Sequence, residues 1–320
     1  MRHDRLYFIG TRNSMLAQQQ TKIVLQELLK YCPQNSRLLK VHVIPIQTTG
    51  DKILDRPLAD LGGKALFSKE IQEKLLDGSL DFAVHSLKDM EHTLPPGLCI
   101  GAVLPREDPR DILITHYNPQ DLMSSPLSSL KRGAVVGTCS PRRTAQLLNQ
   151  RPDLKIIPLR GNVPTRLQKM ITDKLDAIVL AVAGLKRLDL WQQDYPHLTN
   201  YPTLRGFPLP LDSFLPAAGQ GVLALECRSD DIEIKNLLSW VNHLPTELCI
   251  RAERSFLKDF GGNCHTAIAA FARMTSSQEL ELKVQYAPYT PSPFPLLTKK
   301  DSGPADDPES LGRRLAATFK

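Results

Sequence analysis

The feature that most constrains the fold of this chain is a repeated alternation of short apolar runs with longer amphipathic stretches. Strand-like runs alternate with helix-like stretches through the first 115 residues. The strand-like runs lie at 6–10, 39–48, 80–86 and 99–104, and the helix-like stretches lie at 14–30 and 66–78. Apolar residues recur at helical spacing within 14–30, and Gly78 supplies a stop signal for the second stretch. This alternation predicts α/β domains with largely parallel or mixed sheets.

The alternation continues through the middle of the chain. We expect strands and helices in turn, the strands at 134–138, 154–160 and 177–183 and the helices at 140–150 and 163–173. Residues 186–216 are rich in proline and turn formers, and they predict a long connection or insertion. Beyond them we expect a strand at 222–227 and a helix at 245–260. Two antiparallel strands should follow at 267–273 and 279–287, and then a polar, proline-rich loop at 288–310.

Length and composition narrow the class of protein. A chain of 320 residues with 42% hydrophobic and 23% charged residues predicts two or three globular domains. No apolar run reaches the ~18 residues of a membrane span, and the N-terminus lacks the apolar region of a signal peptide. We therefore expect a cytoplasmic protein. The six cysteines form no CxxC pair, which favours free thiols over a disulfide framework.

The chain is basic, with a formal net charge of +6 and a pI of about 9.0. Nucleic acid is one class of acidic partner, but the chain has only two Trp, 6% aromatic residues and no long basic tract. An acidic small-molecule substrate explains the modest excess of positive charge equally well.

Five arginines occupy positions at which α/β folds place ligands, namely strand ends and helix starts: Arg12, Arg142, Arg143, Arg160 and Arg166. Cationic side chains at a helix N-terminus oppose the helix dipole, so their presence there favours a bound anion. Guanidinium groups bind carboxylates or phosphates through two parallel hydrogen bonds. The alternative, ordinary solvated arginines, fits one such position better than five.

Two further features lie beside these junctions. Lys88 and Asp89 follow a strand-like run, where the carboxylate could pair with a developing cation or donate a proton. The alternative there is a surface ion pair that contributes little. The connection 50–67 is long, charged and contains paired glycines, which is typical either of a lid with Lys64 facing a ligand or of an exposed flexible loop.

The stretch DFGGNCHTAIAA, residues 259–270, places Cys264 after a predicted helix and two glycines. Four interpretations are open for this side chain: a core thiol, a metal ligand, one half of a disulfide or a nucleophile. His265 is adjacent, but no second Cys or His stands nearby at zinc spacing. An exposed loop thiol is compatible with nucleophilic chemistry.

Nine short motifs occur in the order found in the hydroxymethylbilane synthases, also called porphobilinogen deaminases: GTRNSMLA, GGKALFSKEI, AVHSLKDM, REDPRD, GTCSPRR, LRGNVPTRL, AVAGLKRL, LPAAGQG and GNCHTAIAA. The chain resembles this family over about residues 5–275. The resemblance implies a three-domain α/β protein. Two of the domains would be periplasmic-binding-protein-like lobes with doubly wound mixed sheets. The first lobe would comprise residues 1–106 and 221–241, and the second would comprise residues 107–220. A smaller α+β domain, 242–320, would carry the cofactor.

The resemblance also implies the activity and the cofactor. Members of the family condense four porphobilinogen molecules head to tail with release of ammonia, and they hydrolyse the product to 1-hydroxymethylbilane in tetrapyrrole biosynthesis. The growing chain is attached to a dipyrromethane primer, held by a thioether that falls here on Cys264. The expected partners are porphobilinogen and polypyrrole intermediates. The protein is expected to be a monomer, and we expect no bound metal, no nucleic-acid partner and no association with a membrane.

Motif by motif, the resemblance assigns roles to residues of this chain. Asp89 is the implied catalytic carboxylate, while Lys64 and Phe67 fall in the implied active-site loop and its following helix. Asp89 also matches a cofactor-binding position, and ten further side chains match cofactor- or substrate-binding positions, Cys264, Arg12, Ser14, Lys88, Ser140, Arg142, Arg143, Arg160, Arg166 and Gln220. Every pyrrole bears an acetate and a propionate, so six linked rings carry about twelve negative charges. The arginines would supply the positive charges that bind these carboxylates.

Some residues depart from the usual motifs of the family. Cys139 and Pro141 stand where Ser and Leu are common, Asn263 replaces a common Gly, and the segment around 190–212 is longer. None of these changes removes a charged group of the implied site. The competing hypothesis is a non-catalytic anion-binding module on the same two-lobed fold, which would need neither the aspartate nor the cysteine.

Overall fold

The computed structural model describes residues 5–31, 40–52, 66–116, 126–192, 197–261, 266–288 and 296–319. The chain divides into two compact units. Unit 1 comprises Met1–Glu107 and Val222–Ile250, and unit 2 comprises Asp108–Gly221 and Arg251–Lys320. The expected third domain, from residue 242 onward, is a finer division than this and stays a prediction.

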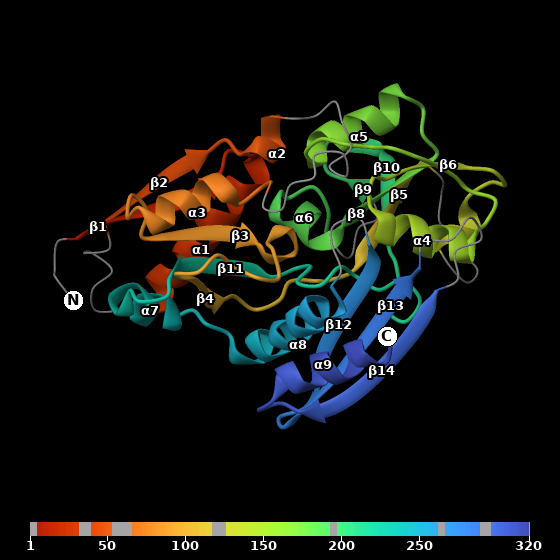
Figure 1. The fold of residues 1–320 in the computed structure, drawn as a ribbon. Coiled ribbons are helices and arrows are strands. Elements are labelled where there is room, and N and C mark those ends of the chain that lie inside the picture. The colour runs from red at the N-terminus through yellow and green to blue at the C-terminus, as the bar shows by residue number, and fades with distance from the viewer. Residues whose placement is uncertain are drawn as a thin grey trace. The chain divides into compact units, whose positions relative to one another are not determined.

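Unit 1 is built on a five-stranded mixed sheet with the strand order β2-β1-β3-β11-β4 (Figure 1). Its strands are β1 (Leu6–Arg12), β2 (Lys40–Ile46), β3 (Phe82–Ser86), β4 (Leu98–Val103) and β11 (Leu223–Arg228). Strand β1 runs parallel to β2 and β3, whereas β11 runs antiparallel to β3 and β4. The carboxyl ends of the parallel strands therefore meet at one edge, where α/β proteins bind ligands.

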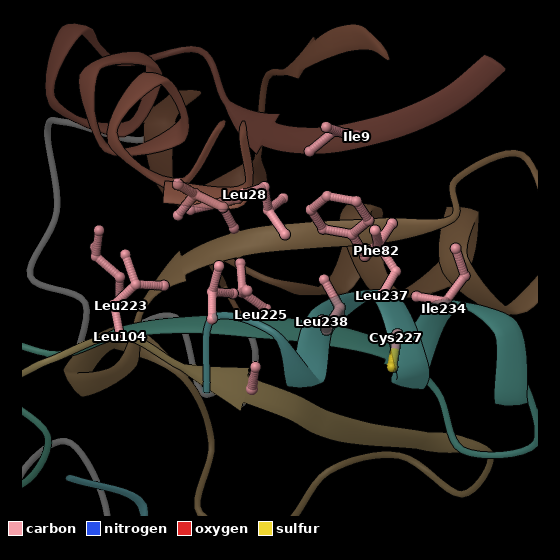
Figure 2. Close-up of a cluster of buried hydrophobic side chains, with 14 of the residues drawn as sticks. Ile9, Leu28, Phe82, Leu104, Leu223, Leu225, Cys227, Ile234, Leu237 and Leu238 are labelled. Atoms are coloured by element: carbon pink, nitrogen blue, oxygen red, sulfur yellow. The ribbon is translucent and has the colours of Figure 1, made fainter. Parts of the chain in front are cut away.

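Helices cover both faces of this sheet. Leu28 and Leu237 pack against one face in the cluster shown in Figure 2, and Ile71 and Leu75 pack against the other. Each of these side chains is at most 4% exposed, and such burial contributes about 1.5–3 kcal/mol per side chain. The helices of unit 1 are α1 (Met15–Tyr31), α2 (Thr49–Lys52), α3 (Lys69–Leu76), α7 (Ile232–Ser239) and the 3-10 turn η2 (Leu87–Asp89).

Unit 2 carries a six-stranded mixed sheet with the order β7-β6-β8-β5-β10-β9. Its strands are β5 (Asp111–Thr115), β6 (Val135–Gly137), β7 (Lys155–Ile157), β8 (Ala177–Ala181), β9 (His197–Leu198) and β10 (Tyr201–Pro208). Alternate residues of β5 enter the clusters on opposite faces, Ile112 and Ile114 on one and Leu113 on the other. The helices beside this sheet are α4 (Pro141–Gln150), α5 (Val163–Thr172), α6 (Val182–Arg187) and the 3-10 turn η4 (Pro126–Ser129).

The C-terminal part of unit 2 is a separate antiparallel sheet of three strands, in the order β12-β13-β14. These strands are β12 (Ala267–Ser276), β13 (Glu279–Ala287) and β14 (Leu297–Pro304), and the helices are α8 (Leu244–Phe260), which begins in unit 1, and α9 (Pro308–Ala317). Phe256, Phe260, Tyr286 and Phe319 pack ring against ring, with centroids 4.8–6.2 Å apart. The expected α/β class with mixed sheets and a smaller C-terminal sheet is confirmed.

Two predictions of irregular structure are wrong. The segment 186–216 contains strands β9 and β10, and β10 pairs with β5. The two prolines within β10, Pro202 and Pro208, lie near the strand ends, where a missing N–H disturbs the ladder least. The expected loop 288–310 contains β14, an edge strand whose side chains are largely exposed. Backbone pairing with β13 holds it there, and such pairing does not require apolar side chains.

Candidate functional site

A pocket opens in unit 1 at the carboxyl ends of β1 and β3. Because these strands are parallel neighbours, Arg12 at the end of β1 and the residues that follow β3 reach the same edge. Ser14 directly precedes α1, and its Oγ accepts a hydrogen bond from the Ala17 N–H at 3.2 Å, as an N-cap does. The pocket is lined by Arg12, Ser14, Leu16, Ala17, Gln20, Phe67, Val84, His85, Ser86 and Asp89.

The guanidinium of Arg12 is held on two sides. It forms an ion pair with Asp51 of α2, and its Cζ lies 4.2 Å from the centroid of the Phe67 ring. Burial disfavours the Asp51 charge, but the hydrogen bond and the charge of Arg12 outweigh it and lower the pKa of Asp51. A cation fixed in this way in a pocket wall is suited to bind a ligand carboxylate.

Asp89 lies beside that cation without being locked to it. Its Oδ2 is 3.8 Å from Nη1 of Arg12, which is longer than a hydrogen bond, and its side chain is 39% exposed. Lys88, the preceding residue of η2, is also exposed. The carboxylate is therefore accessible to a molecule that enters the pocket.

Buried polar contacts fix strand β3 behind the pocket. The Gln20 amide and the Ser86 hydroxyl exchange hydrogen bonds of 2.7 and 3.1 Å. Nε2 of His85 lies 3.0 Å from Oε2 of Glu226, and the Gln72 amide donates to Oε1 of Glu226 at 3.0 Å. Glu226 is 0% exposed, and the Gln72 hydrogen bond offsets part of the cost of burying its carboxylate, whereas the contact between His85 and Oε2 lacks hydrogen-bond geometry. These contacts join α1, α3 and β11 to the strand that precedes η2.

A second cationic cluster lies inside unit 2, at the start of α4. Asp111 is 0% exposed and accepts hydrogen bonds from Nη1 of Arg142 at 2.6 Å and from Nη2 of Arg143 at 2.6 Å. The Gln220 amide donates to the same carboxylate at 3.1 Å. Burial opposes the charge of Asp111, but the two guanidinium groups outweigh burial and place the pKa of this carboxyl far below its usual range. Ser140 caps the helix, since its Oγ accepts from the Arg143 N–H at 3.4 Å.

This buried cluster carries unbalanced positive charge. Within the described part of the chain, Arg142 and Arg143 oppose the single carboxylate of Asp111, and both arginines are only 6% exposed. A net charge in a poorly solvated position is costly unless a counter-ion is present. The cluster therefore favours an additional anion at the start of α4.

The last two predicted arginines lie at the start of α5. Arg166 donates from Nε to the Gly161 carbonyl at 2.7 Å, and Asn162 caps the helix by accepting from the Thr165 N–H at 2.9 Å. Gly161 has φ +122°, and a Cβ there would lie 2.8 Å from Thr165, so this turn requires glycine. Arg160 precedes the turn and is partly exposed.

The structure thus brings the predicted residues together in groups. Arg12, Ser14, Phe67 and Asp89 share the pocket of unit 1, and Arg142, Arg143 and Gln220 share Asp111 in unit 2. Lys64 and Cys264 lie outside the described residues. Among the residues that the structure covers, no group of three or more His, Cys, Asp or Glu side chains could hold a metal ion, and no helix is long and apolar enough to cross a membrane.

Sequence reasoning missed several residues that hold these groups in place: Asp51, Asp111, His85 and Glu226. Asp111 stands in the motif REDPRD and Asp51 follows the strand β2, so both had a recognisable position. Which cation each one meets depends on the sheet order, which the motifs do not give. The observed residues are typical of one class, the α/β proteins that bind acidic ligands at strand ends and helix starts.

Comparison with known proteins narrows this class to a family. The family described as "Porphobilinogen deaminase, dipyromethane cofactor binding domain" matches residues 7–236, and "Porphobilinogen deaminase, C-terminal domain" matches residues 247–320. The chain is 46% identical over 270 residues to a porphobilinogen deaminase of Syntrophomonas wolfei, covering 84% of this chain and 81% of the relative. It is 44% identical over 308 residues to one of Moorella thermoacetica, covering 96% and 91%.

The chain belongs to the porphobilinogen deaminase family. It is accordingly a transferase of tetrapyrrole biosynthesis with a dipyrromethane cofactor-binding domain, as the ordered motifs predict. Among solved structures, a periplasmic binding protein of Salmonella typhimurium is similar with a TM-score of 0.40 and 10% identity, covering 74% of this chain and 92% of that one.

Proposed function

We propose that this chain joins four porphobilinogen molecules head to tail, releases one ammonia at each addition, and hydrolyses the product to 1-hydroxymethylbilane. The observation that carries the proposal is an accessible carboxylate, Asp89, beside a fixed guanidinium, Arg12, in one pocket at the strand ends. Porphobilinogen bears two carboxylates and a cationic leaving group, so its conversion calls for a cation and a carboxylate at neighbouring positions.

The residues present fit a dipyrromethane cofactor. Each of its rings bears an acetate and a propionate, and the cluster on Asp111 contains one more guanidinium than carboxylates. When bound through a thioether to Cys264, the group supplies the free pyrrole carbon to which the first substrate is joined. We assign the binding of its carboxylates and those of the growing chain to Arg12, Ser14, Lys88, Ser140, Arg142, Arg143, Arg160, Arg166 and Gln220.

Asp89 is assigned the catalytic role. Loss of ammonia leaves an electron-poor pyrrole, and a carboxylate in contact with the pyrrole N–H stabilises positive charge on that ring. The same carboxyl group, when protonated, can pass its proton to the leaving amine. Arg12 holds a substrate carboxylate, and the ion pair with Asp51 and the ring of Phe67 limit the movement of Arg12. Lys64 and the segment before Phe67 are assigned to an active-site loop on the resemblance alone.

Intact-mass spectrometry of the purified protein tests the cofactor assignment. We expect wild-type protein made with porphobilinogen available to be heavier than the bare chain by two linked pyrrole units. Cys264→Ala should have only the mass of its polypeptide. Cys139→Ala is the matched control, because Cys139 is an exposed thiol at the start of α4 and should leave the added mass in place. A bare mass for the wild type, or an unchanged added mass in Cys264→Ala, would refute the tether.

We further propose, on the resemblance, that the protein works as a cytoplasmic monomer that binds porphobilinogen and polypyrrole intermediates. Light scattering after size exclusion tests the oligomeric state. The expected mass is that of one chain, 35.7 kDa plus the cofactor. A mass twice as large at micromolar concentration would contradict the monomer.

A further inference from the structure

Two cysteines face each other across neighbouring strands of unit 1. Cys99 on β4 and Cys227 on β11 are directly opposite in the antiparallel register, and their Sγ atoms are 3.9 Å apart. Opposite residues of an antiparallel pair have Cα atoms about 4.5–5.5 Å apart, which lies within the range of about 4.4–6.8 Å that a disulfide spans. Small side-chain rotations therefore suffice to bring the two sulfurs to bonding distance.

The surroundings of the two sulfurs differ. Cys227 is 0% exposed and packs in the core cluster with Ile234 and Leu238 (Figure 2), whereas Cys99 is partly exposed. Gly101, next but one to Cys99 on β4, lies directly against the buried sulfur, because a Cβ at Gly101 would lie only 2.8 Å from Sγ of Cys227. One sulfur is therefore accessible to a small molecule in solvent, and the other is shielded in the core.

The two thiols also differ in acidity. The hydrogen bond between them lowers the pKa of Cys99 to about 7, and the positive charge of Lys235 acts in the same direction. That hydrogen bond raises the pKa of Cys227, which burial raises further. Since the thiolate is the nucleophilic form of cysteine, Cys99 is the sulfur suited to attack an electrophile, and Cys227 is suited to complete the reaction.

We propose that Cys99 and Cys227 form an oxidative modification site that reacts with small hydroperoxides and closes as a disulfide. The Cys99 thiolate attacks one oxygen of hydrogen peroxide, the O–O bond breaks, and a sulfenic acid and one water form after proton uptake. The Cys227 sulfur then attacks the sulfenic sulfur. The S–O bond breaks, and the departing hydroxide takes the Cys227 proton as a second water. Two thiols lose two electrons and one peroxide gains them.

The disulfide would form away from the pocket. Cys227 and Glu226 are consecutive on β11, so their side chains point to opposite faces of the sheet. Glu226 contacts His85 of the pocket wall and Gln72 of α3, while Cys227 packs with α7. Oxidation should therefore leave turnover close to that of the reduced enzyme. It should raise the unfolding temperature by several degrees, because the bond closes a long loop of the unfolded chain.

Peptide mapping of the holoenzyme after treatment with hydrogen peroxide tests the site. The enzyme is oxidised, its remaining thiols are blocked with an alkylating reagent, and the digest is searched for linked peptides. We expect the Cys99 peptide to be joined to the Cys227 peptide, with the intact mass lowered by about 2 Da and restored by a dithiol reductant. Cys99→Ser should abolish the link and the thermal shift, while Cys139→Ser, which removes an exposed thiol of unit 2, should keep both.

Three results would overturn the proposal. One is alkylation of Cys99 and Cys227 at the same extent before and after peroxide. Another is accumulation of Cys99 as sulfinic acid, about 32 Da heavier, without a link to Cys227. The third is linkage of Cys99 to any other cysteine of the chain. The mapping of the wild type decides all three, so the result does not depend on the folding of a variant.

Discussion

The two units place the same residue types, arginine and aspartate, in opposite settings. In unit 1, Nη1 of Arg12 lies 3.8 Å from Oδ2 of Asp89, and the Asp89 side chain is 39% exposed. In unit 2, Nη1 of Arg142 lies 2.6 Å from Oδ2 of Asp111, and the Asp111 side chain is 0% exposed. The first arrangement leaves both groups available to a ligand. The second holds the groups against each other before any ligand arrives.

The difference separates what each carboxylate contributes to activity from what it contributes to stability. An exposed ion pair contributes roughly 0–1 kcal/mol to stability, because solvent screens it. Removing one partner of a buried pair costs about 3–5 kcal/mol, because the other charge stays behind without compensation. Substitutions at the two aspartates should therefore have different signatures, although the residues look alike in the sequence.

The largest effect is expected from Asp111→Asn. The amide keeps the shape of the side chain but leaves two guanidinium groups buried without a counter-charge, so the free energy of unfolding should fall by about 3–5 kcal/mol. Urea unfolding measures it. Asp108→Asn is the matched control, because Asp108 pairs with Arg110 in a more solvated position and should cost only about 1 kcal/mol. Equal losses in the two variants would mean that burial of the cluster is not what distinguishes unit 2.

The second effect is expected from Asp89→Asn. We expect turnover to fall by about 10²–10³-fold, equivalent to about 2.7–4 kcal/mol of transition-state stabilisation, with an unchanged unfolding midpoint. Product formation and thermal unfolding should be measured on one preparation that retains the cofactor. Asp230→Asn, at an exposed carboxylate of unit 1 outside the pocket, should keep full turnover. Wild-type turnover in Asp89→Asn would exclude this carboxylate from the reaction.

A smaller effect is expected from acid. The folded-state pKa of Asp111 is depressed, so its contribution to stability is present above the unfolded pKa of about 3.9 and is lost as pH falls below it. Between about pH 6 and pH 3 this one carboxylate should account for about 1 kcal/mol of the lost unfolding free energy. Urea titrations at both pH values measure the loss, which should be smaller by that amount in Asp111→Asn. An identical pH dependence of the unfolding free energy in wild type and variant would mean that Asp111 does not contribute to the loss of stability in acid.

The smallest effect is expected from Phe67→Leu. This change removes the ring beneath the Arg12 guanidinium, a contact worth about 0.5–1 kcal/mol, so KM should rise about 2- to 5-fold with kcat nearly unchanged. Steady-state kinetics measure both constants. Phe8→Leu removes a partly exposed ring of unit 1 outside the pocket and should leave KM unchanged. A fall in kcat alone would mean that Phe67 acts on the reaction and not on the position of Arg12.

The site of unit 1 was the easier one to predict, because its pieces are local. Arg12 closes an apolar run, and Ser14 caps the helix that begins directly after it, so both positions follow from a dozen neighbouring residues. Lys88 and Asp89 follow another run in the same way, and β3 ends at Ser86 as expected. Strand ends and helix starts are marked in a sequence by composition and capping, which depend on nearby residues alone.

The rest of the site could not be predicted, because it depends on which strands become neighbours. Arg143 meets Asp111, which lies 32 positions earlier in the chain. Glu226 meets Gln72, 154 positions away, since β11 lies next to β3 in the sheet. The same limit explains β14, a polar strand that is held by its partner's backbone. Whether an arginine faces solvent, a ligand or an internal carboxylate is set by this long-range order.

The position of β11 has a consequence for how the protein is made. This strand lies between β3 and β4, yet residues 108–221, with the whole six-stranded sheet of unit 2, separate it from β4 along the chain. A ribosome that has reached residue 221 has already produced Arg12, Ser14 and Asp89, but β3 still has an open edge and β4 has no neighbour. The sheet of unit 2 can form first, since domains fold as their strands emerge. The pocket residues are therefore among the first parts of the molecule to be synthesised, yet the sheet that carries them is completed only after the sheet of unit 2.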